Sequence, residues 1–240
     1  MRLVYIYHSG FAIEGDGFSI LFDFYRDALL ADGSHYVHDH LLKREGPLYV
    51  FASHFHPDHF NPEILTWKEE KPDTIYLLSR DILKRRRAKE SDARFLRVGD
   101  IYQDGLLWVK AFGSTDVGVS FLLRLEGKTI FHAGDLNNWH WTDESTPEEV
   151  KDAEGRYLKE VSRLREETDK LDLAMFPVDP RLGSDFDRGA RQLVDRLRIA
   201  IFVPMHYWEM PDKTKVVEPY VTGKGTRFCL LPSPGASVEF

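Results

Sequence analysis

Six consecutive residues gather imidazole and carboxylate groups in one short stretch. The sequence His54-Phe55-His56-Pro57-Asp58-His59 uses three of the chain's 10 histidines and one aspartate. Four ionisable groups this close repel one another and lose hydration unless a cation compensates them. Neutral imidazole and carboxylate are good ligands for Zn²⁺, and also for iron or manganese. The stretch therefore predicts a metal site, and the alternative is an exposed polar loop.

The residues before this stretch predict a strand that would place it at the edge of a sheet. The run "LYVFAS" at residues 48–53 is continuously apolar, which is typical of a strand covered on both faces. Functional sites in α/β folds collect at the carboxyl ends of strands. His54 and His56 share one side of an extended chain. Pro57 then turns the chain, so Asp58 and His59 approach from another direction.

Two later strand ends carry side chains of the same kind. Asp135 follows Gly134 after the predicted strand "KTIFHA", and a glycine there lets the backbone pass close to a metal. His206 follows the apolar run "IFVPM". Taken singly, His206 is more often a partly buried structural residue. Three strand ends with such groups in one chain favour a shared metal site.

Composition restricts the class of protein. At 240 residues, 42% hydrophobic and 13% aromatic, the chain is expected to bury a large core without help from a metal or disulfide, so a metal would serve chemistry. The net charge of -7 argues against a nucleic-acid partner. No apolar run is long enough for a transmembrane helix, and no signal peptide is visible. We expect a cytoplasmic protein that acts on a small molecule, without membrane contact; the oligomeric state is not predicted.

The order of elements predicts one α/β domain over residues 1–240. The first half reads as short strands, with a hairpin turn at Gly127-Lys128. The second half alternates strands and helices, with a helical excursion at about 141–170 that opens on a capping box at 146–149. A further amphipathic helix is expected at 187–198, with Ala190, Leu193, Val194 and Leu197 on one face. No linker rich in proline, glycine or serine separates the halves.

These motifs, in this order, resemble the metallo-β-lactamase superfamily. The His-x-His-x-Asp-His signature, the later Gly-Asp and the late histidine match residues 54–59, 134–135 and 206, and Asp23 matches an early aspartate. The resemblance implies an α/β (α+β) fold, a four-layer αββα sandwich with a metal site at one edge. The implied metal ligands are His54, His56, Asp58, His59, Asp135 and His206, with Asp135 bridging two ions. Within the superfamily, "HSGFAIE" and "KTIFHAGDLNNWHW" are most similar to the ascorbate-6-phosphate lactonase-like hydrolases.

One position departs from the family pattern. Ser114 in "FGSTDVGVSF" stands where the family commonly has a histidine, so one of two metal positions lacks its usual third imidazole. Water, Asp116 or His132 are the candidates to replace it, although His132 is expected to play a supporting or core role. We therefore expect at least one tightly held ion, most often Zn²⁺, with Fe or Mn as alternatives and a second ion undecided. Two roles are open for His8: it faces the site, or it is an ordinary histidine at the end of a strand.

The expected chemistry is hydrolysis without a protein nucleophile. A water bound to the metal becomes hydroxide near neutral pH and attacks a small ester, lactone or phosphate-containing substrate. Asp58 is the catalytic carboxylate that orients or deprotonates this water. A nuclease or phosphodiesterase is one alternative, and a non-hydrolytic iron protein is another. Asp179, Arg181, Arg188 and the aromatic residues of "NNWHWTDE" are candidates to line the substrate pocket, with turn formation, solvent exposure and packing as the ordinary explanations.

Overall fold

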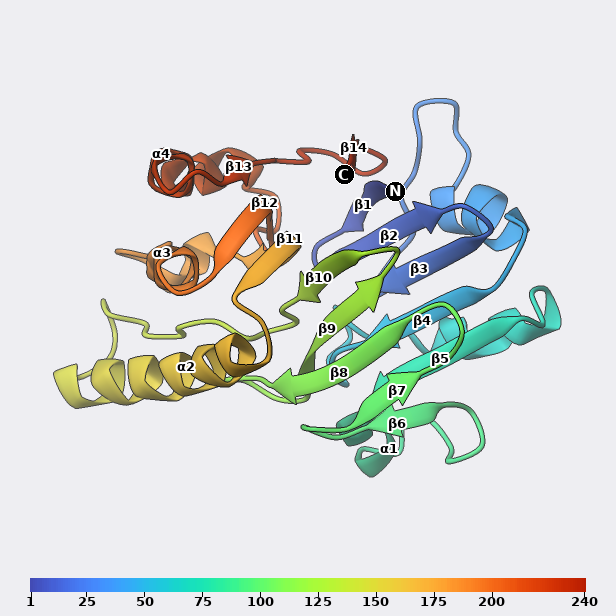
Figure 1. Cartoon of the computed structure of the whole chain (residues 1–240), viewed down its shortest axis with the longest axis horizontal. Helices are drawn as coiled ribbons and strands as arrows, with labels where there is room; N and C mark the ends of the chain where they lie inside the picture. The colour runs from blue at the N-terminus through green and yellow to red at the C-terminus, as the bar shows by residue number, and fades with distance from the viewer. The chain divides into compact units, whose positions relative to one another are not determined.

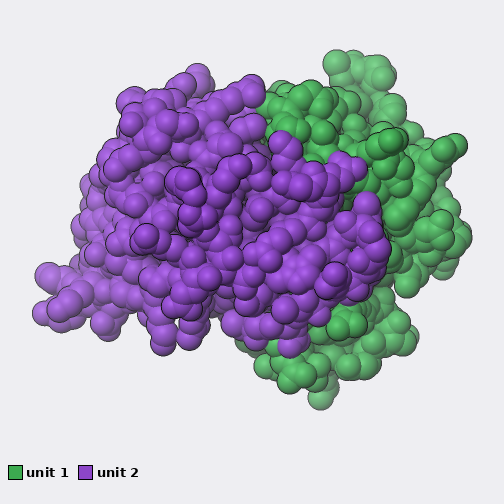
Figure 2. Space-filling view, in the orientation of Figure 1, with its two compact units in different colours: residues 1–97, 231–240 green, residues 98–230 purple.

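The computed structural model describes all 240 residues, and the chain divides into two compact units (Figure 2). Unit 1 comprises residues 1–97 and 231–240, and unit 2 comprises residues 98–230. Each unit contains one seven-stranded sheet with both parallel and antiparallel neighbours. The predicted α/β class is confirmed by this mixture of strands and helices. The assignment of the whole chain to a single domain stays a prediction.

The sheet of unit 1 has the order β14-β1-β2-β3-β4-β5-β6 (Figure 1). Strands β14, β1, β2 and β3 are antiparallel, and β3 to β6 are parallel. The strand bounds are β1 Arg2–Tyr7, β2 Gly10–Gly15, β3 Phe18–Phe22, β4 Leu48–Ala52, β5 Thr74–Ser79, β6 Arg94–Leu96 and β14 Ser237–Glu239. The helical segments are α1 at Arg80–Lys84, a π-helix at Tyr36–His40, and 3₁₀ helices at Leu41–Lys43 and Pro62–Glu69.

The hydrophobic core of unit 1 explains why β4 carries no polar residue. All five residues of β4 are buried, as the continuous apolar run predicted. Val50 of β4 belongs to a buried cluster with Leu21 of β3, Leu78 of β5 and the ring of Trp67. Because β3, β4 and β5 are parallel, their carboxyl ends lie at the same edge of the sheet. The residues that follow β3 and β4 therefore meet at that edge.

The sheet of unit 2 has the order β13-β12-β11-β10-β9-β8-β7. Strands β7 to β10 are antiparallel neighbours, and β10 to β13 are parallel. The strand bounds are β7 Ile101–Gln103, β8 Trp108–Gly113, β9 Val119–Leu125, β10 Lys128–His132, β11 Lys170–Pro177, β12 Arg198–Met205 and β13 Arg227–Phe228. The helices are α2 at Pro147–Glu167, α3 at Arg188–Val194 and α4 at Glu218–Gly223, with 3₁₀ helices at Pro180–Leu182 and Pro211–Val217. Figure 1 shows the three α-helices beside the strands of this unit, where α3 contacts β11 and α4 contacts β13.

Short sequence motifs predicted most of the helices and strands of unit 2. The capping box at the start of α2 is confirmed, because the Thr146 hydroxyl accepts a hydrogen bond from the Glu149 amide at 3.3 Å and the Glu149 carboxylate accepts one from the Thr146 amide at 2.8 Å. Helix α3 is shorter than predicted and ends at Val194. Leu197 is nevertheless buried. Its amide donates to the Leu193 carbonyl at 3.0 Å, so one more turn follows the helix and keeps Leu197 on the buried face.

The β9–β10 hairpin turn was predicted one residue too late. Its two turn residues are Glu126 and Gly127, with φ angles of 47° and 71°, and Lys128 already belongs to β10. Two consecutive positive φ angles are the geometry that matches the twist of paired strands.

No helix of the chain is both long enough and apolar enough to cross a bilayer. The cytoplasmic location stays a prediction.

Candidate metal centre

The His54–His59 segment follows β4 at the carboxyl edge of the unit 1 sheet. His54 and His59 are completely buried, and their ring centroids are 4.1 Å apart. The ring of His56 is 4.7 Å from that of His54, and one ligand nitrogen of each lies within 4.8 Å of the other. The Asp58 side chain is 24% exposed. Within unit 1, the structure therefore places all four predicted ligands of this segment at one edge.

A buried carboxylate orients His59. Asp23, which follows β3, accepts hydrogen bonds from the Ser53 amide, the Ser53 hydroxyl and His59 Nδ1, each at 2.7 Å. An ionised carboxylate can only accept, so the proton of the neutral His59 ring lies on Nδ1. The lone pair of His59 is then on Nε2. Metal-binding histidines are usually held in this way by a carboxylate at the other ring nitrogen.

His54 is held in the neutral form that a metal ligand requires. Burial lowers its pKa well below the ordinary value, and the nearby His59 ring lowers it further, although the Asp23 charge acts in the opposite direction. Metal ligation needs an unprotonated ring nitrogen. At neutral pH no proton therefore has to be removed from His54 before it binds a cation.

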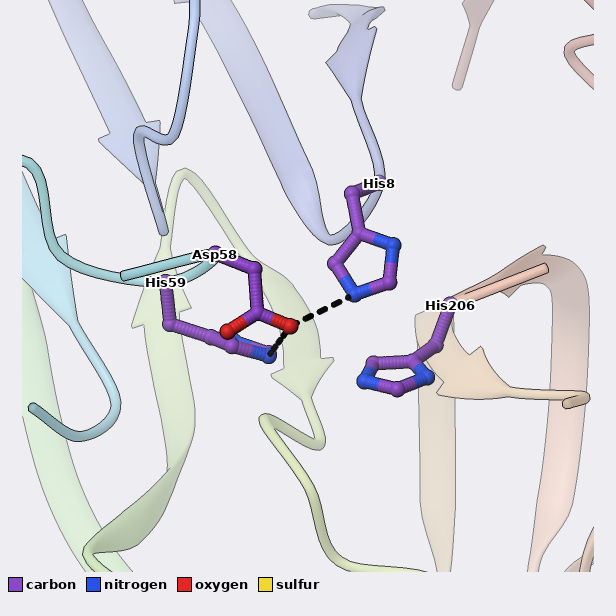
Figure 3. A group of neighbouring side chains, drawn as sticks. All are labelled: His8, Asp58, His59 and His206. Carbon is purple, nitrogen blue, oxygen red and sulfur yellow. Dashed lines mark ion pairs between the residues drawn. The ribbon is translucent and has the colours of Figure 1, made fainter. Parts of the chain in front are cut away.

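His8 lies beside Asp58 and His59, as Figure 3 shows. It follows β1 and is completely buried, with its Nε2 3.3 Å from Asp58 Oδ2. The same carboxylate oxygen is 3.9 Å from His59 Nε2. Burial raises the pKa of Asp58, but the hydrogen bond to His8 and the charges of His59 and His8 outweigh this and hold it well below its usual range. Asp58 is therefore ionised throughout the neutral pH range.

Unit 2 carries the two remaining predicted ligands, which follow β10 and β12. His206 Nε2 is 3.3 Å from Asp135 Oδ1, and His206 Nδ1 is 3.0 Å from Asp179 Oδ2. Burial lowers the pKa of His206, but the Asp135 charge and the Asp179 hydrogen bond and charge raise it more, so the pKa is raised overall. Burial likewise raises the pKa of Asp179, while His206 and Arg181 lower it to about 2.

The loop that contains Ser114 is tied to the loop that contains Asp135. The Thr115 hydroxyl donates to the Asn137 carbonyl at 2.5 Å and accepts from the Asn137 amide at 3.0 Å. A carboxylate oxygen of Asp116 lies within 4.8 Å of one of Asp135. Of the candidates to replace the missing imidazole, Asp116 is the one with a carboxylate beside Asp135. His132 is completely buried and accepts a hydrogen bond from the Gly134 amide at 3.2 Å, which fits a structural role.

Several predicted pocket residues have structural partners inside unit 2. The Trp139 indole donates to the Asp135 carbonyl at 2.8 Å. Arg181 pairs with Asp179 at 2.6 Å, and Arg188 pairs with Asp185 at 2.6 Å. Sequence reasoning missed that Asp179 orients His206. The available signal was the position of an aspartate two residues after the end of β11, in a stretch that otherwise reads as a turn before proline.

Backbone strain coincides with three of these positions. His8, Asp23 and His206 have φ angles of 58°, 44° and 61°, in the left-handed region. Such conformations cost roughly 1–3 kcal/mol each for residues other than glycine and persist where the surroundings enforce them, often at functional sites. Each of the three residues directly follows a strand or lies one step beyond it. The three left-handed turns therefore lie where β1, β3 and β12 end.

The donor set fits a divalent cation. Unit 1 combines buried imidazoles with carboxylates, and unit 2 places the His206 imidazole beside the Asp135 carboxylate; these groups are ligands of zinc and of other first-row metals. Carboxylates at Nδ1 of His59 and His206 leave Nε2 of both rings as the ligand atom. The predicted metal cofactor is therefore supported by the chemistry of the site, and its identity is not fixed by it.

Comparison with known proteins assigns the family. A profile described as the beta-lactamase superfamily domain matches residues 2–152, which is more than half of the chain. The chain belongs to the beta-lactamase superfamily. No curated protein matches it. The predicted sandwich fold class is also confirmed, since the two mixed sheets with helices are those of the metallo-β-lactamase α/β sandwich.

Solved structures share this fold at low sequence identity. A metallo hydrolase from the archaeon Ignicoccus hospitalis is 19% identical, with a TM-score of 0.67 over 100% of this chain and 98% of that chain. An isothiocyanate hydrolase from Delia radicum gut bacteria is 14% identical, with a TM-score of 0.59 over 100% and 99%. A diiron β-hydroxylase from Streptomyces venezuelae is 15% identical, with a TM-score of 0.65 over 99% of this chain and 53% of that chain. This chain thus spans about half the length of the hydroxylase.

Proposed function

We propose that the protein is a metal-dependent hydrolase of a small ester, lactone or phosphate-containing substrate. The metal ligands in this proposal are His54, His56, Asp58 and His59 of unit 1 together with Asp135 and His206 of unit 2. Its main support is the same arrangement at two histidines. His59 and His206 each have a buried carboxylate at Nδ1, which leaves Nε2 as a ligand atom. Arrangements of this kind orient imidazoles for a cation.

When bound, a divalent cation lowers the pKa of a water molecule and polarises a substrate oxygen. The protein's own contribution begins with Asp58, which is ionised and partly accessible, with a side chain 24% exposed. In the proposed reaction, Asp58 orients or deprotonates the attacking water. Asp23 and Asp179 keep His59 and His206 in the required tautomers. The proton ends on the alcohol or phosphate that leaves when the ester bond breaks.

Within this function, a lactone or a sugar-phosphate-like ester is the finer proposal. Its support is the likeness of "HSGFAIE" and "KTIFHAGDLNNWHW" to the ascorbate-6-phosphate lactonase-like hydrolases. The net charge of -7 supports a small substrate over a nucleic acid. We propose Zn²⁺ as the metal, with one ion bound tightly. The second ion depends on how Asp116 and Asp135 together compensate for Ser114.

A second candidate function is an oxygen-reacting iron protein. The observation that favours it is the donor set in unit 1, where two histidines and one aspartate lie together at His8, Asp58 and His59. Two imidazoles and one carboxylate with open positions are typical of non-haem Fe(II) oxygenases. Metal identity in the purified protein therefore separates the two candidates.

The test combines metal analysis with turnover. Protein purified without chelator is expected to carry at least about one zinc per chain and to hydrolyse at least one member of a panel of lactones, phosphodiesters and thioesters. Chelator and the His59→Ala variant are expected to remove both metal and turnover. The control is His38→Ala, because His38 also has a carboxylate at Nδ1, Asp27, but lies outside the proposed site. Absence of any bound metal would contradict the proposal, and iron without hydrolysis would favour the second candidate.

A further inference from the structure

We propose that His8 is itself a metal ligand, so that unit 1 binds a cation through His8, Asp58 and His59. The inference rests on the proposed function and adds a ligand to it. The family signature at residues 54–59 includes Asp58 and His59, whereas His8 stands 50 positions earlier in the chain, after β1. Figure 3 shows the His8 ring directed at the Asp58 carboxylate.

The distances suit ligands that share one ion. Two ligands bound at about 2.0–2.1 Å in a tetrahedral arrangement are about 3.3 Å apart. His8 Nε2 is 3.3 Å from Asp58 Oδ2, and His59 Nε2 is 3.9 Å from the same oxygen. The second value corresponds to a wider angle at the metal. The rings of His8 and His59 meet edge to face with centroids 5.6 Å apart, so the two nitrogens approach Asp58 from different directions.

The backbone around His8 is built to aim this ring. His8 has a φ angle of 58°, and its amide donates to the Tyr5 hydroxyl at 2.8 Å, which pins the left-handed turn. Gly10 completes the turn, since a Cβ there would lie 2.9 Å from the Tyr7 carbonyl and 3.1 Å from the Asp23 carbonyl. The His8 turn is thus packed against Asp23, the residue that orients His59. His8 and Ser9 form the two-residue loop of the β1–β2 hairpin, in which Tyr7 pairs with Gly10, and the positive φ angle of His8 belongs to this loop.

The chemistry of the three groups matches an open metal site. Two neutral imidazoles and one carboxylate leave a divalent cation with a net charge of about +1 and with positions for water and substrate. His8 is completely buried, so its ring is already withdrawn from bulk water before a cation binds. The competing role for His8 is that of a hydrogen-bond donor to Asp58, without contact to the metal.

The experiment compares His8→Asn with the wild type, both stripped of metal and reloaded with Co²⁺. Asparagine tolerates a positive φ angle better than most residues, so the turn is expected to survive. Its shorter side chain removes the imidazole ligand. We expect Co²⁺ affinity, measured by chelator competition, to fall about 100-fold or more, beyond the 10- to 100-fold that loss of an outer partner typically costs. We also expect the visible Co²⁺ absorption bands to change. The matched control is His35→Asn, an exposed histidine of unit 1, which should alter neither readout.

A second variant keeps the test decisive if His8→Asn does not fold. Glycine adopts positive φ angles freely, so His8→Gly retains the turn and leaves a space where the imidazole stood. Free imidazole added to the Co²⁺-loaded His8→Gly protein should restore the wild-type bands, because an untethered ring can coordinate Co²⁺ from the space that the His8 side chain left. Bands in His8→Asn or His8→Gly that match the wild type without imidazole would overturn the proposal.

Failure of this inference is distinguishable from failure of the proposed function. If wild-type protein binds no Co²⁺ and contains no native metal, both the proposed function and the ligand role of His8 are wrong. If wild-type protein binds Co²⁺ and the His8 variants bind it with unchanged affinity and spectrum, only the His8 assignment is wrong. A spectrum that changes in His8→Asn but not in His35→Asn supports the assignment.

Discussion

The Asp23→Asn substitution tests whether the proton of His59 is controlled by its carboxylate partner. Asp23 accepts hydrogen bonds from His59 Nδ1 and from the amide and hydroxyl of Ser53. An asparagine keeps the shape of the side chain and tolerates the φ angle of 44°. Its amide nitrogen, however, donates where the carboxylate accepted. Turned towards His59, that nitrogen favours the tautomer with Nδ1 unprotonated and the proton on Nε2, the proposed ligand atom.

The expected loss follows from this change of tautomer. Removal of a carboxylate partner behind a metal-binding histidine typically weakens metal affinity by about 10- to 100-fold, or about 1.4 to 2.7 kcal/mol. We expect Asp23→Asn to lose zinc affinity within this range in a chelator competition assay, while its free energy of unfolding in the metal-free form changes little. The Ser53 amide keeps an acceptor, since the asparagine oxygen remains available to it.

Asp27→Asn is the matched control. Asp27 is also a nearly buried aspartate that accepts from a histidine, His38 Nδ1, at 2.5 Å and from the Val37 amide at 2.7 Å. It lies outside the proposed ligand set, so zinc affinity should not change. Equal zinc affinities of wild type and Asp23→Asn would refute the tautomer argument. An equal loss in both variants would show that general destabilisation, not the state of His59, determines the affinity.

Three further expectations concern stability. Burial lowers the pKa of His38, but its hydrogen bonds to two carboxylates raise it more, so the pKa is raised overall. Protonated His38 therefore stabilises the folded state below about pH 6.5, and this stabilisation is lost as pH rises through the folded-state pKa. The free energy of urea unfolding of His38→Gln should depend less on pH in this range than that of the wild type. A parallel pH dependence would contradict this. Thr146→Ala removes the capping hydroxyl of α2 and should lower the free energy of unfolding by about 1 kcal/mol; no change would mean that the helix start does not limit stability. Gly189→Ala would place a Cβ 2.0 Å from the Asn137 amide oxygen and should destabilise by about 1–3 kcal/mol, whereas Gly155→Ala on α2, with open space around it, should stabilise by about 0.5–1 kcal/mol in the same thermal or urea assay; the opposite order would refute the packing argument.

The fold and the ligand motif were predictable where neighbouring residues carry the signal. An apolar run bounded by polar residues defined β4, and the alternation of His54 and His56 followed from the two-residue period of extended chain. The capping box located the start of α2 for the same reason, since all of its contacts lie within four residues. Asp135 and His206 were predicted as ligands from their positions at strand ends, and the resemblance to the superfamily implied the same set.

The supporting residues were less predictable because their roles arise from contacts across the chain. Asp179 is separated by 27 positions from His206, and His8 by 50 positions from Asp58. An aspartate before proline and a histidine after a strand each have an ordinary local explanation, so spacing did not decide between the alternatives. The end of α3 was missed for a related reason, since the apolar face continues through Leu197 after the regular helix has ended.

The pairing of β14 with β1 has a consequence for synthesis of the chain. Strand β1 precedes unit 2 in the chain, but its partner β14 follows unit 2 and is synthesised after it. Until then, the backbone edge of β1 is open to pairing with another chain, which is a known route to aggregation. On the ribosome, β1 must therefore wait for residues 237–239, and slowed translation of unit 2 should prolong that exposure. The backbone nitrogen of Met1 is 3.3 Å from the Phe240 carbonyl, so a short peptide joining residue 240 to residue 1, with the chain opened elsewhere, would let β14 be synthesised next to β1.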